Sequence, residues 1–419
     1  MDSLADEARE LVRQLVSGEC HDARPSVDVT ELLDAVSPHL HALGITRVGD
    51  LTALDTIGIP VFFACRPNSR TLSVSQGKAL DPGRARLGAI MEALEQAFAE
   101  RHELLVRQVG SRLEMRGRGL KCIDTATTLR CSPVGEDVAR CRSWVLGTSL
   151  LRGDDVYVPY ELAGVDFRVG TGWDHSTYRM STVGLGAGGS LASASLHALL
   201  EVIENDATAA LDVFGLQGDL ARPVCIRTGR HAGLDEALEK VNAAGLGCFF
   251  ARVRSGTDIP TVAAFLNSPL DTHENLGIRT FAGFACRFSE YEAAFAALLE
   301  AVQSRLTQFA GSREDLAPDQ YRQRLSLLHP KPGASAYLDE THCSIGSENS
   351  TLEKFRHALR AVTRQGAEDV VLVPLGAVGP DIRVVRVLVC GLQSAAGNGV
   401  VRLSASTLDA IMSRRGVPA

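Results

Sequence analysis

Several signals that would assign the chain to a common class are missing from its 419 residues. No apolar run reaches the roughly 18 residues of a membrane-spanning helix, so no membrane association is expected. The N-terminal stretch MDSLADEARELVRQL is acidic and amphipathic, which is not the pattern of a secretory signal peptide. The net charge of −7 argues against a nucleic-acid-binding protein, because such a protein would present a basic face. These absences favour a cytoplasmic protein.

Two common kinds of site are also missing. The ten cysteines never form Cys-x-x-Cys, the spacing typical of a zinc site or a redox pair. In a chain of this length we interpret them as reduced and mostly buried thiols. The glycine-rich turns contain no Gly-x-x-x-x-Gly-Lys-Ser/Thr sequence, so a nucleotide would not be bound by a P-loop.

The composition predicts an ordinary globular body, with 45% hydrophobic and 22% charged residues. Residues 1–43 are expected to form an N-terminal helical segment, although Pro38 weakens its second helix at 31–43. The remainder, 44–419, alternates β-rich runs with helical stretches and shows no linker that would divide it. We therefore expect an α+β catalytic domain that follows a small helical segment.

Local patterns predict particular elements within this body. The stretch 143–160 is typical of a β-hairpin that turns about Gly153 and Asp154. A helix is expected near 351–365, ending at Gly366.

The strongest pattern is the stretch STVGLGAGGSLASASLHALLEVIENDA at 181–207, in which a glycine-rich turn runs into an amphipathic helix. Glu201 and Glu204 lie three residues apart and therefore share one face of that helix. Ala194 and Ala198 precede Glu201 on the same side. Their small side chains leave room for a ligand beside the carboxylates.

The same arrangement occurs once upstream and once downstream, at intervals of about a hundred residues. We infer three similar strand–turn–helix units that contribute equivalent helices to one site. The copies of the pattern Ala-x-x-x-Ala-x-x-Glu-x-x-Glu/Gln are Ala85, Ala89, Glu92 and Glu95 upstream, and Ala293, Ala297, Glu300 and Gln303 downstream.

A solvated helix face is the alternative interpretation, because two glutamates at this spacing usually face water and alanine is common in any helix. Three copies with matched alanines favour a site. Carboxylate oxygens are hard ligands that suit Mg²⁺. No copy contains the Glu-x-x-His motif of a carboxylate di-iron protein.

Taken in order, the motifs resemble the YcaO family. The matching segments are RPNSRTLSVSQGKAL with MEALEQ, STVGLGAGGSLASASLHALLEVIENDA, and EAVQSRLTQFAGSRED; GITRVGDLTALDTIGIPV resembles stand-alone members, including those encoded beside TfuA partners. The resemblance runs from about residue 44 to 392. It implies a YcaO-like α+β fold, with the three units around one ATP and Mg²⁺ site.

The resemblance implies an ATP-dependent enzyme that modifies a peptide backbone amide during maturation of a ribosomally synthesised peptide. In the family, ATP phosphorylates the amide oxygen and a nucleophile then attacks the activated carbon. A Cys, Ser or Thr side chain gives an azoline and an amine gives an amidine, whereas sulfide gives a thioamide with a TfuA-type partner. An alternative outside the enzymes is a non-catalytic scaffold that binds the precursor peptide.

The resemblance also implies the site residues, although no catalytic residue is assigned. His197 is interpreted as a packing residue, and Arg313 as part of a charged surface turn. The implied metal ligands are Glu92, Glu95, Glu201 and Glu204, and the implied nucleotide-binding residues are Ser75, Lys78, Gly188, Gln303 and Arg305.

The chain departs from the family at several polar positions while it keeps the carboxylates, so we interpret it as a divergent enzyme. It also ends in SRRGVPA, without the proline-rich tail of many azoline-forming members. The precursor peptide is the expected partner, either bound directly or presented by a leader-binding or TfuA-type protein, and a homodimer stays an open alternative. Val183 and Gly189 stand where the family usually has Asn. Gln96, Asn205 and Ala296 stand where it has Arg. Arg287 replaces a His of the family, and Cys390 replaces a common Pro.

Overall fold

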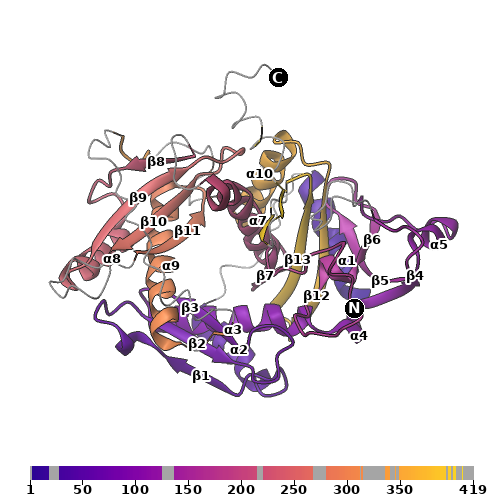
Figure 1. Ribbon diagram of the computed structural model, residues 1–419, viewed down its shortest axis with the longest axis horizontal. Helices are drawn as coiled ribbons and strands as arrows, with labels where there is room; N and C mark the ends of the chain where they lie inside the picture. The colour runs from indigo at the N-terminus through magenta and orange to yellow at the C-terminus, as the bar shows by residue number, and fades with distance from the viewer. Residues whose placement is uncertain are drawn as a thin grey trace.

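A computed structural model describes residues 2–17, 28–124, 136–214, 220–267, 280–311, 313–314, 336–339, 345, 349–392, 395–397, 400–402 and 408. Within these ranges the chain forms three larger antiparallel sheets and one two-stranded ribbon, with helices between and around them (Figure 1). None of the described helices has the length and apolarity needed to cross a bilayer.

The largest sheet has six strands. Its path runs β4 (Val106–Gly110), β5 (Arg142–Ser149), β12 (Asp369–Val378), β13 (Ile382–Cys390) and β7 (Leu185–Gly188), with β6 (Asp155–Pro159) also paired to β5.

Two smaller sheets lie beside it. One has the order β1 (Arg47–Asp50), β2 (Val61–Cys65) and β3 (Val74–Lys78). The other has the order β11 (Thr280–Cys286), β10 (Thr261–Asn267), β9 (Gly247–Val253) and β8 (Ala221–Val224). The short ribbon pairs β14 (Ala395–Gly397) with β15 (Val400–Arg402).

Three long helices each follow one strand of a different sheet. Helix α3 (Pro82–Ala99) follows β3, α7 (Leu191–Phe214) follows β7, and α9 (Glu290–Ala310) follows β11. Asp81 caps α3 by accepting a hydrogen bond from the Arg84 amide, and Pro82 occupies the first turn, where a missing N–H costs nothing. Helix α9 ends at Gly311, whose φ of 58° is the left-handed conformation that glycine favours.

The remaining helices surround these elements. They are α1 (Asp2–Ser17), α2 (Val29–Val36), α8 (Ala232–Ala243) and α10 (Thr351–Arg364), with the short helices α4 (His102–Leu105), α5 (Arg112–Gly117) and α6 (Tyr160–Ala163) and the 3₁₀ turns η1 (Ser37–His39) and η2 (Thr52–Leu54).

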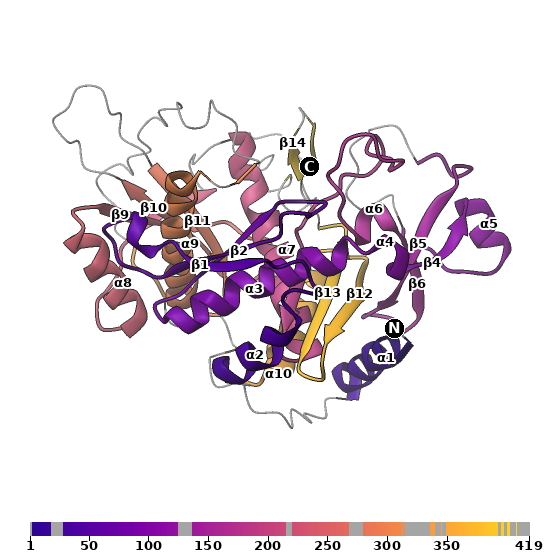
Figure 2. The ribbon, with the colours of Figure 1, turned by 90° about the horizontal axis from the view of Figure 1, so that it is seen from below.

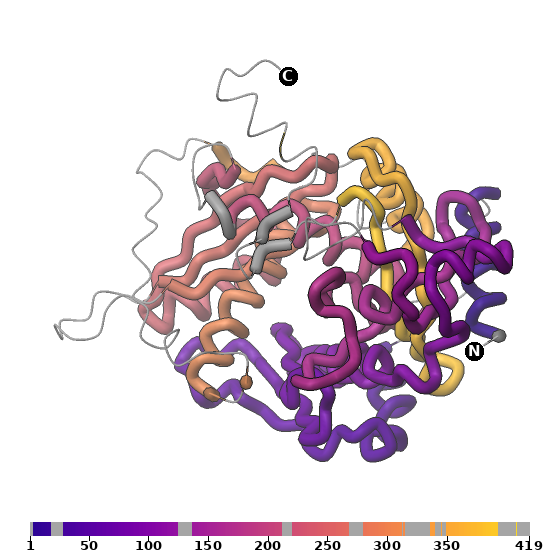
Figure 3. Tube along the Cα trace, turned by 45° about the vertical axis from the view of Figure 1, so that its right-hand side comes forward, coloured from indigo at the N-terminus to yellow at the C-terminus, as the bar shows by residue number. Residues whose placement is uncertain are grey.

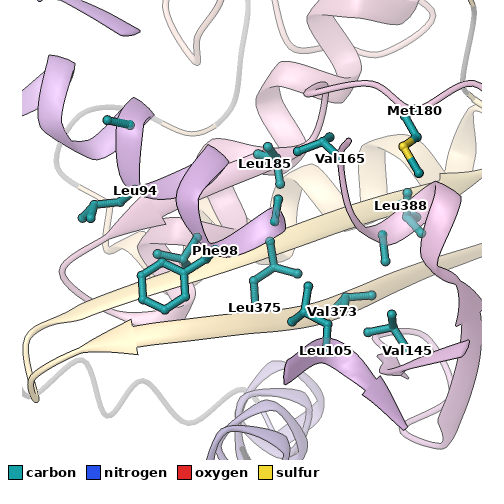
Figure 4. Packing of buried hydrophobic residues seen from close by; sticks show 14 of the residues in the cluster. Leu94, Phe98, Leu105, Val145, Val165, Met180, Leu185, Val373, Leu375 and Leu388 are labelled. Carbon is teal, nitrogen blue, oxygen red and sulfur yellow. The ribbon is translucent and has the colours of Figure 1, made fainter. Parts of the chain in front are cut away.

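Strands β12 and β13 of the six-stranded sheet are buried on both faces, and they are apolar at nearly every position. Val373 and Leu388 face a core that includes Leu94 and Phe98 of α3 (Figure 4). Neighbouring residues such as Leu372 face a second core, which is formed with α7, α10 and α1. Side chains of a strand point alternately to opposite faces, so one apolar strand supplies both cores.

Helix α1 belongs to the second core although it begins the chain. It lies beside β12 in every view of the backbone (Figures 1, 2 and 3). Arg9 forms an ion pair with Asp155, and Arg383 forms one with Glu7. The Arg356 guanidinium donates hydrogen bonds to the last carbonyls of α1, which are otherwise without intrahelical partners.

Several local predictions agree with the structure. The hairpin at 143–160 corresponds to β5 and β6, and the helix near 351–365 corresponds to α10. The helix expected at 31–43 is wrong in its extent, because α2 ends at Val36 and Pro38 lies in the 3₁₀ turn that follows. The division between 1–43 and 44–419 stays a prediction.

Candidate functional site

A cavity of about 790 Å³ lies where α3, α7 and α9 face one another. In Figure 1, α9 lies to the left of α7, and α3 lies below both of them. Strand β3 contributes Gly77 and Lys78 to the cavity wall, and the segment around β7 contributes Thr182 and Ala187. Val29 at the start of α2 also lines it, so the N-terminal helical segment forms part of this wall.

All four predicted metal ligands line this cavity, together with a fifth carboxylate, Glu300. Glu92 and Glu95 come from α3, Glu201 and Glu204 from α7, and Glu300 from α9. The sequence pattern placed each pair on one helix face, and the packing of the helices turns these faces toward one space. The fifth carboxylate belongs to the third copy of the pattern.

The backbone of the adjoining strands holds these glutamates. The first glutamate of each pair accepts a hydrogen bond from its own unit: the Gln76 amide donates to Glu92 at 2.9 Å, and the Gly184 amide donates to Glu201 at 3.0 Å. One carboxylate oxygen of each glutamate is thereby fixed. The second oxygen of each makes no hydrogen bond to a described residue.

The second glutamate of each pair reaches the next unit along the chain. The Ala187 amide, on the strand before α7, donates to Glu95 at 2.8 Å. The Cys286 amide, on the strand before α9, donates to Glu204 at 3.1 Å. The Lys78 ammonium, on the strand before α3, lies 3.2 Å from Glu300 of α9 and closes the ring of contacts.

Burial and mutual repulsion raise the pKa of all four paired glutamates. Burial acts most strongly, and it raises the pKa of Glu201 to about 7 and that of Glu204 to about 8. It also raises the pKa of Glu92, and raises that of Glu95 well above its ordinary value with help from the charges of Glu201 and Glu92. Bound cations would stabilise the ionised form of these shielded carboxylates, which otherwise repel one another.

The donor set fits Mg²⁺ shared with a phosphate-bearing ligand. Among the described residues, no three or more His, Cys, Asp or Glu side chains form a ready-made cage for a metal ion. Mg²⁺ is usually held by one or two carboxylates together with substrate phosphates, and so needs no such cage. Glu92, Glu95, Glu201 and Glu204 each retain an oxygen that could take this role.

Basic side chains complete the lining. Lys78 faces Glu300, and Arg84, Arg287 and Arg313 also line the cavity. The Arg287 guanidinium donates a hydrogen bond of 2.7 Å to the Cys286 carbonyl. Arg313, interpreted from the sequence as part of a charged surface turn, lines the cavity, and the adjacent Glu314 is exposed. Cations beside shielded carboxylates are suited to a polyanion bound through metal ions.

His197 is open to the cavity, where it lies one turn before Glu201 on α7. The side chain is exposed, but the partial desolvation by the surrounding cavity walls, with the charges of Arg287 and Lys78, lowers its pKa to about 4. It makes no hydrogen bond to a described residue. The interpretation as a packing residue missed this neutral imidazole, although its helical spacing from Glu201 was visible in the sequence.

Three predicted nucleotide-binding residues are not part of the cavity wall as far as the described residues show. Ser75 is buried in β3 opposite Ala64, and Gly188 pairs with Arg383. Arg305 donates to Asp55 at 2.7 Å and packs over Phe309, and its role in nucleotide binding stays a prediction. Lys78 and Gln303 do line it.

Comparison with known proteins assigns the family. The model of the family described as YcaO cyclodehydratase, ATP- and Mg²⁺-binding, matches residues 76–393. The chain belongs to the YcaO family. The resemblance found in the sequence is therefore confirmed, as are ATP and Mg²⁺ as the cofactors of this family.

Relatives and solved structures agree with this assignment. A protein of Rhizobium leguminosarum bv. trifolii, described as uncharacterized and in the tfuA 3′ region, is 31% identical over 397 residues, 92% of each chain. The structure of YcaO from Methanopyrus kandleri bound with AMPPCP and Mg²⁺ matches with a TM-score of 0.64 and 22% identity, covering 87% of this chain and 91% of that one. A heterocyclase in complex with substrate and cofactor matches with a TM-score of 0.69 and 15% identity, covering 86% and 52%. These two structures show that the α+β fold is YcaO-like.

Proposed function

We propose that this YcaO protein uses ATP and Mg²⁺ to activate a backbone amide of a peptide during maturation of a ribosomally synthesised peptide. The observation that carries the proposal is the convergence of five carboxylates, from three helices, on one cavity that also contains Lys78 and Arg287. A scaffold that only binds a peptide would have no need of shielded carboxylates whose pKa values are raised.

The proposed reaction has two steps. The amide oxygen attacks the terminal phosphorus of ATP and ADP leaves, which makes the amide carbon electrophilic. A nucleophile then adds to that carbon, and the former amide oxygen departs in inorganic phosphate. A Cys, Ser or Thr side chain of the peptide would give an azoline, and an amine would give an amidine; both products have lost the elements of water.

The residues of the cavity support the first step. Mg²⁺ held by Glu92, Glu95, Glu201 and Glu204 would neutralise the phosphates and orient the transferring group. Lys78 and Arg287 would bind phosphate oxygens, the lysine as a point charge and the arginine as a planar fork. Backbone hydrogen bonds fix the glutamates beforehand, so little reorganisation is needed when the nucleotide binds.

Thioamide formation is the second candidate, and one observation favours it. The relative that matches 92% of this chain is described by its place in the tfuA 3′ region. A TfuA-type protein would then be the partner of this chain, and a sulfide donor would replace the side-chain nucleophile. The non-catalytic scaffold remains the third candidate, and a homodimer is not required by any of them.

The test is to incubate the purified chain with Mg²⁺, ATP and a precursor peptide encoded beside its gene, with and without a co-expressed TfuA-type protein. Phosphate release with loss of water from the peptide supports cyclodehydration. A gain in mass from oxygen-to-sulfur exchange, dependent on the TfuA-type protein and sulfide, supports thioamidation. Binding of the peptide without ATP consumption or peptide modification would refute enzymatic activation and favour the scaffold.

A further inference from the structure

We propose that Arg386 is a positioning residue that holds the Glu201 side of the cavity in place from behind the wall. The inference rests on the proposed function, because it assigns Arg386 a part in binding Mg²⁺ and nucleotide. Arg386 lies on β13, is 3% exposed, and is not among the described residues that line the cavity. Any effect it has on a bound ligand must therefore pass through other residues.

A tight turn connects Arg386 to the site. The Arg386 guanidinium donates a hydrogen bond of 2.6 Å through Nη1 to the Ser181 carbonyl. In the turn that follows, the Leu185 amide donates to the Thr182 carbonyl at 3.0 Å. Thr182 and Leu185 both line the cavity. Arg386 thus holds the residue just before a turn whose first and last residues, Thr182 and Leu185, form part of the cavity wall.

The same turn holds Glu201. Gly184 donates its amide to the Glu201 carboxylate at 3.0 Å, and its carbonyl accepts a hydrogen bond of 2.8 Å from the Val387 amide. Its φ of 84° is one that glycine adopts readily, and a Cβ there would lie 2.4 Å from the Val387 carbonyl oxygen. The orientation of the Gly184 amide therefore depends on how β13 holds this turn at both ends.

The charge of Arg386 points to the same role. A buried guanidinium is costly unless an opposite charge or a full set of hydrogen bonds compensates it. The Nε atom of Arg386 has no hydrogen-bond partner among the residues that the structure describes. Glu201 is the acidic group whose charge acts on this guanidinium, and the attraction opposes the repulsion that Glu201 receives from Glu92 and Glu300. A positive charge behind the wall is useful where several carboxylates must remain together.

The variants that test the inference are Arg386→Met, which removes the donor and the charge, and Arg386→Lys, which restores both in part. Arg383→Met is the matched control, because Arg383 lies on the same strand but forms its ion pair with Glu7 of α1. The first measurement is affinity for Mg²⁺ with AMPPCP by calorimetry. The second is hydrogen exchange of the 181–188 segment without nucleotide, and the third is thermal unfolding.

We expect Arg386→Met to lower affinity for the Mg²⁺ nucleotide about 10- to 100-fold, as for other residues that orient metal ligands. Exchange at 181–188 should become faster even without ligand. Arg386→Lys should recover most of both properties, and Arg383→Met should leave both at the wild-type level. If Arg386→Met does not fold, a folded Arg386→Gln variant takes its place with the same expectation.

The inference is overturned if Arg386→Met binds the Mg²⁺ nucleotide like the wild type, or if Arg383→Met loses as much affinity. Failure of the proposed function has a different signature, since the wild type itself would then not bind the Mg²⁺ nucleotide. In that case the exchange of 181–188 in the ligand-free variants still shows whether Arg386 holds the turn.

Discussion

Glu201 illustrates how a residue in the cavity wall is prepared for a ligand. One oxygen accepts a hydrogen bond from the Gly184 amide, and burial raises the pKa of the carboxyl group to about 7. Glu201→Gln keeps an acceptor for that amide but removes the negative charge. It therefore separates metal binding from local structure.

We expect Glu201→Gln to reduce ATP turnover by orders of magnitude, because it removes a proposed ligand for the metal ion that the proposed phosphoryl transfer needs. The ligand-free variant should unfold at the same temperature as the wild type or higher at pH 8. The raised pKa means that ionising Glu201 costs stability as pH rises, and glutamine does not carry this cost. Phosphate release and thermal unfolding would be measured, with Glu236→Gln on the exposed side of α8 as control. Full turnover in Glu201→Gln would show that Glu201 is not a ligand.

Asp166 contributes to acid stability instead. Burial alone would raise its pKa, but hydrogen bonds from the Arg168 guanidinium, the Trp173 indole and the Arg168 amide outweigh burial and lower the pKa to about 2. A carboxyl group with a depressed pKa contributes stability above its ordinary pKa, and this contribution disappears as pH falls through the folded-state value.

Asp166→Asn should lower the free energy of unfolding by about 1 to 2 kcal/mol at pH 7, since Arg168 is half exposed and its charge is partly screened. The difference from the wild type should shrink as pH falls from about 4 toward 2. Urea unfolding across this range measures it, with Asp6→Asn in an exposed ion pair as the near-neutral control. A difference that does not change with pH would contradict the assignment.

At the scale of elements, glycine allows each long helix to approach the strand before it. A Cβ on Gly77 would lie 2.2 Å from the Ala85 carbonyl oxygen, and one on Gly186 would lie 2.4 Å from the Ala194 carbonyl oxygen. Both alanines occupy the same position in the repeated pattern. The third contact is offset, because Gly283 meets Ala297, one turn further along α9 than the matching alanine. The small residues of the pattern thus serve close strand–helix packing, in addition to leaving room beside the carboxylates.

Gly283→Ala should destabilise the protein by about 1 to 3 kcal/mol, because the added methyl group would lie 2.2 Å from the Ala297 carbonyl oxygen and α9 would have to move. Affinity for the Mg²⁺ nucleotide should also fall, since the same methyl group would lie 2.7 Å from the Glu300 Cβ. Denaturant unfolding and calorimetry measure the two effects. Gly117→Ala is the control, because no atom of the described residues lies within 4 Å of its Cβ and alanine favours the helix there. Equal stability of Gly283→Ala and the wild type would contradict the packing argument.

At the scale of the whole molecule, the two N-terminal helices have different places. Helix α2 contributes Val29 to the cavity, whereas no described residue of α1 lines it. Helix α1 covers one face of the six-stranded sheet through Ala8, Leu11 and Leu15. We therefore infer that α1 stabilises the six-stranded sheet without contacting the ligand.

Leu11→Ala should lower the free energy of unfolding by about 2 to 4 kcal/mol, because it leaves a cavity in the core beneath α1. The folded protein should bind the Mg²⁺ nucleotide with unchanged affinity. Unfolding in urea and calorimetry on the same samples separate the two properties. Val16→Ala, at a position 79% exposed on the same helix, is the control and should be near neutral. A loss of affinity in folded Leu11→Ala would show that α1 does act on the site.

The sequence by itself determined which side chains share a helix face. Glutamates three residues apart project to one side of any α-helix, so each pair was visible before the fold was known. The position of Arg305 could have been anticipated in the same way. It lies two residues after Gln303 and is therefore rotated about 200° around the helix, away from the cavity and toward Asp55. The family resemblance implied that Arg305 belongs to the site, whereas its helical spacing from Gln303 did not.

Only the tertiary structure decided which of these faces meet. The partners of Glu95 and Glu204 are amides on strands of the following unit, and Glu300 contacts Lys78, which lies 222 residues earlier in the chain. Such contacts depend on how the helices of three sheets pack against one another. The helical spacing of residues in the sequence carries no information about that packing. The role of Arg386 could not be predicted from the sequence for the same reason. A buried arginine in an apolar strand can be assigned a role only when the turn that it contacts is known.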